Sequence, residues 1–245
     1  MLIFILGASL GSFLNVCIYR IPAEQSVVFP PSHCMECGNR LLARDLIPIL
    51  SYVLLRGRCR YCQSRISWQY PLVELAAGLL FVLVWLTTGL SWATPAGWVF
   101  VAVLLTVTVI DLKHMIIPDE ILLAGVLLGL PFLLLYSWQD ALWGLVAGLA
   151  AGAFMLAIAV VSRGGMGGGD IKLAAFMGLF LGPHMTGLAL FLAFLVGGLL
   201  GIVLVVSGKK GRKDAVPFGP YLALGGVLAL LRGTDIINWY LGFWT

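Results

Sequence analysis

Long apolar runs separated by short polar breaks dominate this sequence. Most of the runs exceed the roughly 10 residues of a membrane β-strand and approach the roughly 20 that an α-helix needs to cross a bilayer. A helix also satisfies its own backbone hydrogen bonds in lipid. The pattern predicts an all-α polytopic membrane protein with about eight transmembrane helices, at residues 2–19, 70–90, 95–110, 119–137, 140–161, 170–183, 185–206 and 217–232. The sixth and eighth runs are short, which favours tilted, half-embedded or internally buried helices.

The composition supports a membrane protein. Of the 245 residues, 61% are hydrophobic and 11% are charged, whereas roughly a quarter of a soluble domain is charged. The first run has no basic segment before it and no small-residue cleavage site, so we expect a retained helix rather than a signal peptide. We expect three parts: a first transmembrane helix at 1–19, a polar module at 20–69, and a transmembrane core at 70–245.

The distribution of basic residues predicts an orientation. With eight helices, 14 of the 15 lysines and arginines fall in loops on one side, and only Arg232 falls on the other. The positive-inside rule makes the basic side cytosolic. Both termini then lie outside, and the polar module lies in the cytosol. We therefore read the net charge of +4 as a topology signal and not as a sign of nucleic-acid binding.

The polar module contains two Cys-x-x-Cys pairs, Cys34 with Cys37 and Cys59 with Cys62. Two such pairs about 20 residues apart have the spacing of a tetrahedral zinc site. Two disulfides are the alternative, but disulfides rarely persist in the reducing cytosol. Because four protein ligands leave no open coordination position, we expect the zinc to be structural.

Two aspartates, Asp111 and Asp170, lie where apolar runs meet polar breaks, at the predicted cytosolic edge. Carboxylates at a bilayer edge are costly and need a reason. A helix N-cap would explain Asp170, but not the glycine run at 164–169 before it. Capping fails for Asp111, because a negative charge at a helix C-terminus opposes the helix dipole.

Other charged residues near these breaks have simpler explanations. Acidic residues in the first turn of a helix complement its dipole, and lysines near a helix end extend to the membrane surface. The first explanation covers Glu74, Asp119 and Glu120, and the second covers Lys113 and Lys172.

An aspartyl protease uses two carboxylates, and in a membrane both must lie at the same depth. Held a few ångströms apart, they cannot both ionise, so one can take a proton from water while the other polarises the scissile carbonyl. The pattern therefore predicts an intramembrane aspartyl protease with Asp111 and Asp170 as the catalytic pair.

Three other classes of protein share part of the pattern. A zinc-stabilised transporter or channel could use the two aspartates along an ion pathway, although transporters bind near the midplane, often between internal repeats, and no repeat is evident here. A presenilin-type or signal-peptide-peptidase-type protease would share the aspartates but has no reason to carry the cysteines. A membrane scaffold could use the zinc module only to bind partners.

Several motifs together give the chain a family resemblance. They are Gly11-Ser-Phe-Leu-Asn-Val-Cys-Ile-Tyr-Arg-Ile-Pro22, the four-cysteine module, Tyr70-Pro-Leu-Val-Glu74, Asp111 through Pro118-Asp119, and Gly167-Gly-Gly-Asp170 with Lys172. In content, order and spacing the chain resembles the type IV prepilin peptidases, which are aspartyl proteases of the bacterial inner membrane.

The resemblance implies a function, a substrate and a second activity. It implies that Asp111 and Asp170 cut the short basic leader from a type IV prepilin or pseudopilin, after a glycine, at the cytosolic face. It also implies methylation of the new N-terminal amine with S-adenosylmethionine. The residues themselves show no binding site for that methyl donor, and they carry no signal for an oligomeric state.

Overall fold

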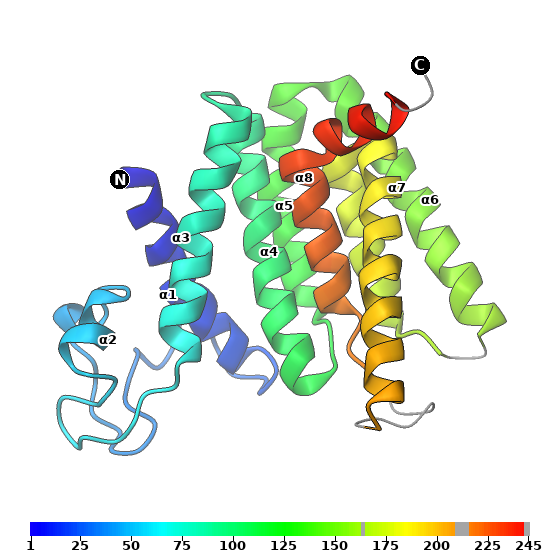
Figure 1. Ribbon diagram of the computed structural model, residues 1–245. Helices are drawn as coiled ribbons and strands as arrows, with labels where there is room; N and C mark the ends of the chain where they lie inside the picture. The colour runs from blue at the N-terminus through cyan, green and yellow to red at the C-terminus, as the bar shows by residue number, and fades with distance from the viewer. Residues whose placement is uncertain (163–164, 209–215, 243–245) are drawn as a thin grey trace. The chain divides into compact units, whose positions relative to one another are not determined.

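The computed structural model describes residues 1–162, 165–208 and 216–242, and it is helical (Figure 1). Within these ranges there is no β-strand, only two isolated β-bridges. The elements are α1 (Leu2–Arg20), a 3-10 helix η1 (Ala43–Asp45), α2 (Leu50–Leu54), α3 (Gln69–Thr88), α4 (Ala93–His114), α5 (Asp119–Tyr136), α6 (Trp138–Val161), α7 (Gly168–Val206) and α8 (Gly219–Leu241). Five of the basic residues counted for the orientation lie outside the described ranges, namely Arg163, Lys209, Lys210, Arg212 and Lys213, and so does Gly164 of the glycine run.

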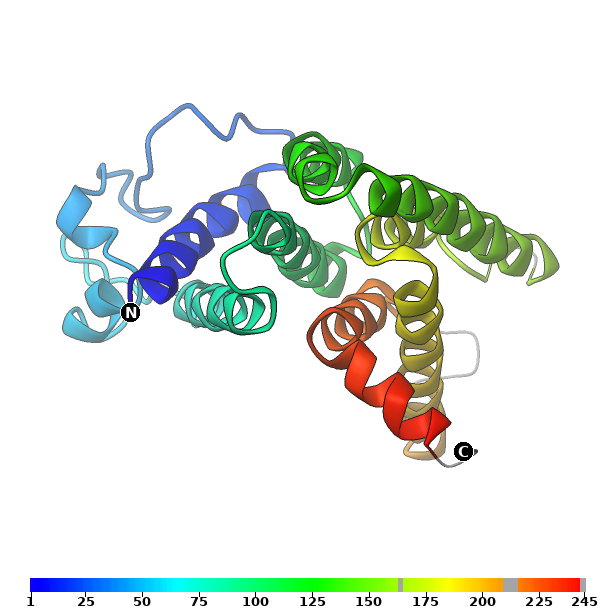
Figure 2. The ribbon, with the colours of Figure 1, turned by 90° about the horizontal axis from the view of Figure 1, so that it is seen from above.

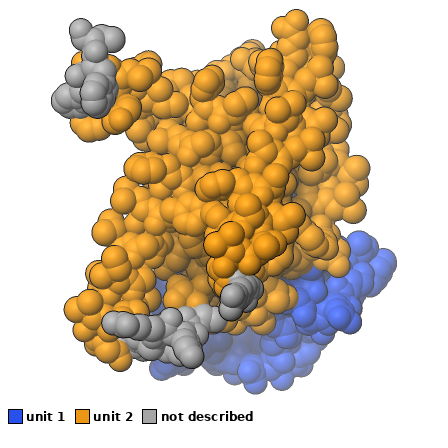
Figure 3. Space-filling model, turned by 90° about the vertical axis from the view of Figure 1, so that its right-hand side faces the viewer, with its two compact units in different colours: residues 1–86 blue, residues 87–245 orange. Residues whose placement is uncertain are grey.

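The membrane character of the chain is confirmed. Seven helices of the described residues are long and apolar enough to cross a bilayer, namely α1 and α3 to α8. The chain forms two compact units, Met1–Leu86 and Thr87–Thr245, which Figure 3 shows in different colours. The first unit contains α1, the cysteine module and most of α3, and the second contains α4 to α8.

α7 contains a break that reconciles seven helices with about eight predicted spans. Gly182 has φ 71° and ψ 178° inside α7 and is followed by Pro183. A positive φ suits glycine, and proline cannot continue the preceding helix. The break falls where the sequence separates the predicted spans 170–183 and 185–206, and Figure 1 shows the chain turning back there.

Contacts with α8 fix the direction of the second arm of α7. Met185 lies against Gly233, late in α8, whereas Gly197 lies against Tyr221 near its start. The two elements therefore run antiparallel, and Figure 2 shows them side by side from above. With the arms of α7 counted separately, α4 to α8 form six helical segments in the described part of the second unit.

The centre of the second unit is a tightly packed apolar core. Phe100 of α4, Met177 of α7 and Leu222 of α8 are fully buried. Close approach of α6 and α7 depends on small residues, because a Cβ at Gly178 would collide with the backbone of Gly148. Small residues at such contacts are typical of membrane helix packing. This core packs α4, α7 and α8 against one another.

Candidate active site and metal centre

Asp111 lies in the last turn of α4 and is buried, with 5% of its surface exposed. The backbone N–H of Gly219, the first residue of α8, donates a hydrogen bond to Asp111 Oδ2 at 2.9 Å. A Cβ on Gly219 would lie 2.7 Å from that same oxygen. A side chain at this position would therefore displace the Asp111 carboxylate, and the contact places the positive end of the α8 dipole at Asp111.

Asp170 is the third residue of α7 and is also buried. The backbone N–H of Gly167 donates to Asp170 Oδ2 at 3.2 Å. The N-cap of α7 is Gly167 and not Asp170, so the simple N-cap explanation is wrong, although the Asp170 side chain does accept a local hydrogen bond at the start of the helix. The glycine run also allows close packing, because a Cβ on Gly169 would lie 2.8 Å from Ile117 Cβ.

The fold brings these two aspartates, 59 positions apart in sequence, to the same end of the second unit. Their carboxyl groups are close enough for a direct electrostatic interaction. Among the described residues, neither forms an ion pair with a basic side chain. Two neighbouring carboxylates without a cation do not ionise independently, which is the electrostatic condition for an acid–base pair.

The nearby lysine of α7 is engaged elsewhere. Lys172 Nζ lies 2.6 Å from Asp119 Oδ2 at the start of α5. Asp119 opens its helix as the sequence predicts, and it also binds Lys172, a cross-helix partner that the sequence did not reveal. Both side chains are more than half exposed, so the pair contributes little to stability.

The four cysteines of the module form one cluster. Their sulfur atoms all lie within 4.8 Å of one another, and Cys34 Sγ lies 3.8 Å from Cys62 Sγ. Zn–S bonds of about 2.3 Å place the sulfurs of a tetrahedral site about 3.8 Å apart. All four cysteines are free, and a disulfide would need sulfurs about 2 Å apart. The cluster fits a structural zinc ion and not the alternative of two disulfides.

The surroundings of the cluster shift the pKa values of its thiols. The pKa of Cys34 falls to about 6, chiefly because the Cys37 backbone N–H favours the thiolate. The pKa of Cys37 rises to about 11: the Asn39 backbone favours its thiolate, but burial and the Cys34 and Cys62 sulfurs outweigh that effect. Thiolates this close therefore repel one another unless a metal ion balances their charge.

One of the arginines near the cysteines pairs with a carboxylate of the module. The sequence suggested that Arg40, Arg58, Arg60 and Arg65 could offset the charge of a zinc–thiolate centre. Arg60 Nε instead lies 2.6 Å from Asp45 Oδ1, whose side chain is 2% exposed. The Asn39 side chain, which the sequence did not single out, donates to Cys37 Sγ at 3.5 Å.

Together, the multi-pass helical fold, the buried aspartate pair and the four-cysteine cluster define a membrane protein with the features of an aspartyl protease. Family comparisons agree. The bacterial peptidase A24 N-terminal domain matches residues 5–88, and the type IV leader peptidase family matches residues 98–202. The chain belongs to the type IV leader peptidase family, which confirms the resemblance seen in its motifs.

Similarity to characterised relatives extends over nearly the whole chain. The chain is 38% identical over 247 residues to a prepilin leader peptidase/N-methyltransferase of Bacillus subtilis, covering 98% of this chain and 97% of that protein. It is 39% identical over 272 residues to the one from Aeromonas hydrophila (98% and 93%) and 36% identical over 267 residues to the one from Pseudomonas aeruginosa (98% and 92%). No solved structure matches the chain.

Proposed function

We propose that this protein removes the leader peptide from type IV prepilins or pseudopilins, with Asp111 and Asp170 as the catalytic pair. The observation that carries the proposal is that two buried carboxylates, from α4 and α7, lie within electrostatic range of each other and form no ion pair with a basic side chain among the residues that the structure describes. Family membership supplies the substrate class, because the relatives are named prepilin leader peptidases.

The geometry supports a shared-proton mechanism. One carboxylate accepts a proton from a water molecule, which attacks the carbonyl carbon of the scissile bond, while the protonated partner donates to the carbonyl oxygen. Each carboxylate also accepts an N–H at a helix start, Asp111 from Gly219 and Asp170 from Gly167. These donors and their helix dipoles stabilise a site with one net negative charge. The titration belongs to the pair.

The charge distribution supports an orientation in the bacterial cytoplasmic membrane. With the basic loops in the cytosol, the zinc module and the aspartate pair lie on the cytosolic side and both termini lie outside. A prepilin would then lie with its apolar helix in lipid and its basic leader in the cytosol. Its scissile bond would be level with Asp111 and Asp170.

Zinc and S-adenosylmethionine complete the proposal. Cys34, Cys37, Cys59 and Cys62 would hold one zinc ion, and with four protein ligands that ion stabilises the module without taking part in chemistry. The relatives' names include N-methyltransferase, which supports methylation of the new N-terminal amine from S-adenosylmethionine. A transporter or channel is not favoured, because family membership and the edge position of the aspartates both fit a peptidase.

One assay tests both proposed activities. Purified protein in detergent is incubated with a synthetic prepilin, with and without S-adenosylmethionine, and the product masses are read. We expect the mature peptide in both reactions, and a product heavier by one methylene group only when the methyl donor is present. Recovery of intact prepilin from folded, zinc-loaded protein would contradict the peptidase proposal.

A further inference from the structure

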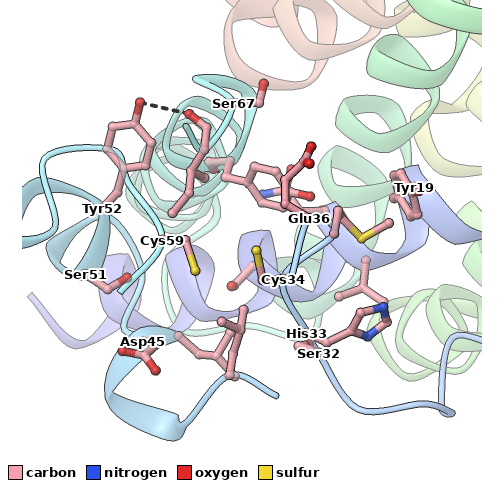
Figure 4. Close-up of a pocket in the computed structure, with 18 of the residues that line it drawn as sticks. Tyr19, Ser32, His33, Cys34, Glu36, Asp45, Ser51, Tyr52, Cys59 and Ser67 are labelled. Carbon is pink, nitrogen blue, oxygen red and sulfur yellow. Dashed lines mark hydrogen bonds between the residues drawn. The ribbon is translucent and has the colours of Figure 1, made fainter. Parts of the chain in front are cut away.

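The first unit contains a cavity of about 710 Å³ that neither the aspartate pair nor the metal centre explains (Figure 4). Its wall is built from the end of α1, the cysteine module and the start of α3. Small-molecule sites in proteins span roughly 300–1,000 Å³. The cavity therefore has the size of a site for a drug-sized or cofactor-sized ligand.

A buried cation without an acidic partner lines this cavity. Arg20, the last residue of α1, is 7% exposed and donates to Ser26 O at 2.9 Å and to Pro30 O at 2.7 Å. No carboxylate forms an ion pair with it among the residues that the structure describes. A buried charge is costly without a counter-charge. Its remaining N–H groups form a planar fork that suits a carboxylate.

A buried acid lines the same cavity. Glu74 of α3 is 7% exposed, and it accepts the Ile49 backbone N–H at 2.7 Å and a hydrogen bond from Ser12. Within the described ranges it forms no ion pair. Ser12 and Arg20 are both on α1, so Glu74 and Arg20 join the cavity at points about 12 Å apart along that helix. A ligand that satisfies both must be elongated and carry charges of both signs.

Aromatic and metal-binding residues complete the lining. Tyr19, Phe29 and Tyr70 offer rings against which a planar base can pack. Cys34 and Cys59 also lie in the wall, so the metal centre forms part of the cavity lining (Figure 4). These features together fit a positively charged nucleoside that ends in an amino-acid head group.

We propose that this cavity binds S-adenosylmethionine, with Arg20 holding its carboxylate and Glu74 supplying the negative charge for its sulfonium. The inference rests on the methylation proposed above. In the transfer, the neutral amine of the new N-terminus forms a bond to the methyl carbon as the carbon–sulfur bond breaks. The electron pair stays on sulfur, which becomes a neutral thioether, and the positive charge passes to nitrogen.

The test compares two ligands that differ only in the group that Arg20 should bind. Dissociation constants of S-adenosylmethionine and of decarboxylated S-adenosylmethionine are measured by calorimetry on the full-length, zinc-loaded protein. The wild-type protein should bind S-adenosylmethionine about 10-fold more tightly than the decarboxylated form, as the loss of a charge-assisted hydrogen bond implies.

Substitution of Arg20 tests whether this residue causes the preference for S-adenosylmethionine over the decarboxylated form. Arg20→Met should weaken S-adenosylmethionine binding by about 10-fold or more and decarboxylated-ligand binding by less than about 3-fold. Arg44→Met, at an exposed arginine of η1 outside the cavity lining, should leave both constants within about 2-fold. The wild-type comparison needs no variant, so it tests the proposal even if Arg20→Met fails to fold.

The assignment would be overturned if Arg20→Met weakened the binding of both ligands equally, or if the wild type bound the two ligands with equal affinity. If the wild type still methylates a mature pilin peptide under those conditions, the inference fails alone and the proposed function stands. If the wild type cleaves prepilin but binds neither ligand, both the site and the proposed methylation fail.

Discussion

At the scale of single residues, the candidate active site depends on a glycine as much as on its two acids. Gly219 places a backbone N–H 2.9 Å from Asp111 Oδ2 and leaves no room there for a side chain. It begins α8, whereas Asp111 ends α4. α8 therefore positions Asp111 through a backbone N–H, a group that every amino acid except proline carries.

Gly219→Ala should reduce cleavage of a prepilin by about 10-fold or more, because a displaced carboxylate loses its place in an acid–base pair. The added Cβ would sit 2.7 Å from Asp111 Oδ2. The matched control is Gly187→Ala in α7, where a Cβ would meet nothing within 4 Å. Equal cleavage rates for the two variants would contradict the role given to Gly219.

Asp45 provides a pH-dependent test within the cysteine module. Burial works to raise the Asp45 pKa, but the hydrogen bonds from Arg60 (2.6 Å) and the Leu42 backbone N–H, together with the charges of Arg60 and Arg44, outweigh burial and lower it. A lowered folded-state pKa stabilises the protein above the unfolded value of about 3.9, and this contribution is lost as pH falls through the folded value.

Asp45→Asn should therefore lower the unfolding midpoint near neutral pH, and the difference from wild type should shrink as pH falls below about 3.9 and through the lowered folded-state pKa. Thermal unfolding measured across this range checks the expectation. Asp235→Asn serves as control, because its pair with Arg232 is largely exposed and contributes little. A midpoint difference that stays constant with pH would show that Asp45 acts through packing alone.

At the scale of helices, the sequence predicted most of the fold because the main signals are local. Apolar runs predicted the long helices, and the boundary between the predicted spans 170–183 and 185–206 lies next to Gly182 and Pro183, where α7 breaks. Cysteine spacing predicted the cluster that the fold assembles. Each of these signals depends on residues within one segment or on a familiar ligand spacing.

The sequence could not predict which residues meet across helices. The Gly219 amide and Asp111 are 108 positions apart, and Lys172 and Asp119 are 53 apart. Such contacts follow from the packing of α4, α5, α7 and α8, and hydropathy does not encode that packing. Arg20 was counted as one basic loop residue among many, because its burial depends on how the module folds over the end of α1.

The cysteine module gives a metal prediction at this scale. Cys34→Ser or Cys59→Ser should release the metal and destabilise the module, because structural zinc contributes directly to folding free energy. Elemental analysis of the wild type should find one zinc per chain, and the variants should show less. Cys17→Ser, outside the cluster, is the control. A metal-free, fully active and equally stable wild type would contradict the assignment.

At the scale of the whole molecule, the account predicts a single orientation in the membrane. The loop between α3 and α4 should lie outside and the cysteine module inside, because the basic residues gather on the module's side. Ser91→Cys should react with a membrane-impermeant maleimide in intact cells, and Arg44→Cys should react only after permeabilisation. The wild-type protein gives the background of its native cysteines. The reverse labelling pattern would invert the topology.

The central claim is that Asp111 and Asp170 act as one catalytic unit, and a double-substitution cycle tests it most directly. Rates of leader removal are measured for Asp111→Asn, Asp170→Asn and the double variant, all folded and zinc-loaded. Each single substitution should slow cleavage by at least about 100-fold, and the double variant should be no slower than either, since residues that act together are not additive. Near-normal cleavage by either single variant, or losses that multiply in the double variant, would contradict the account.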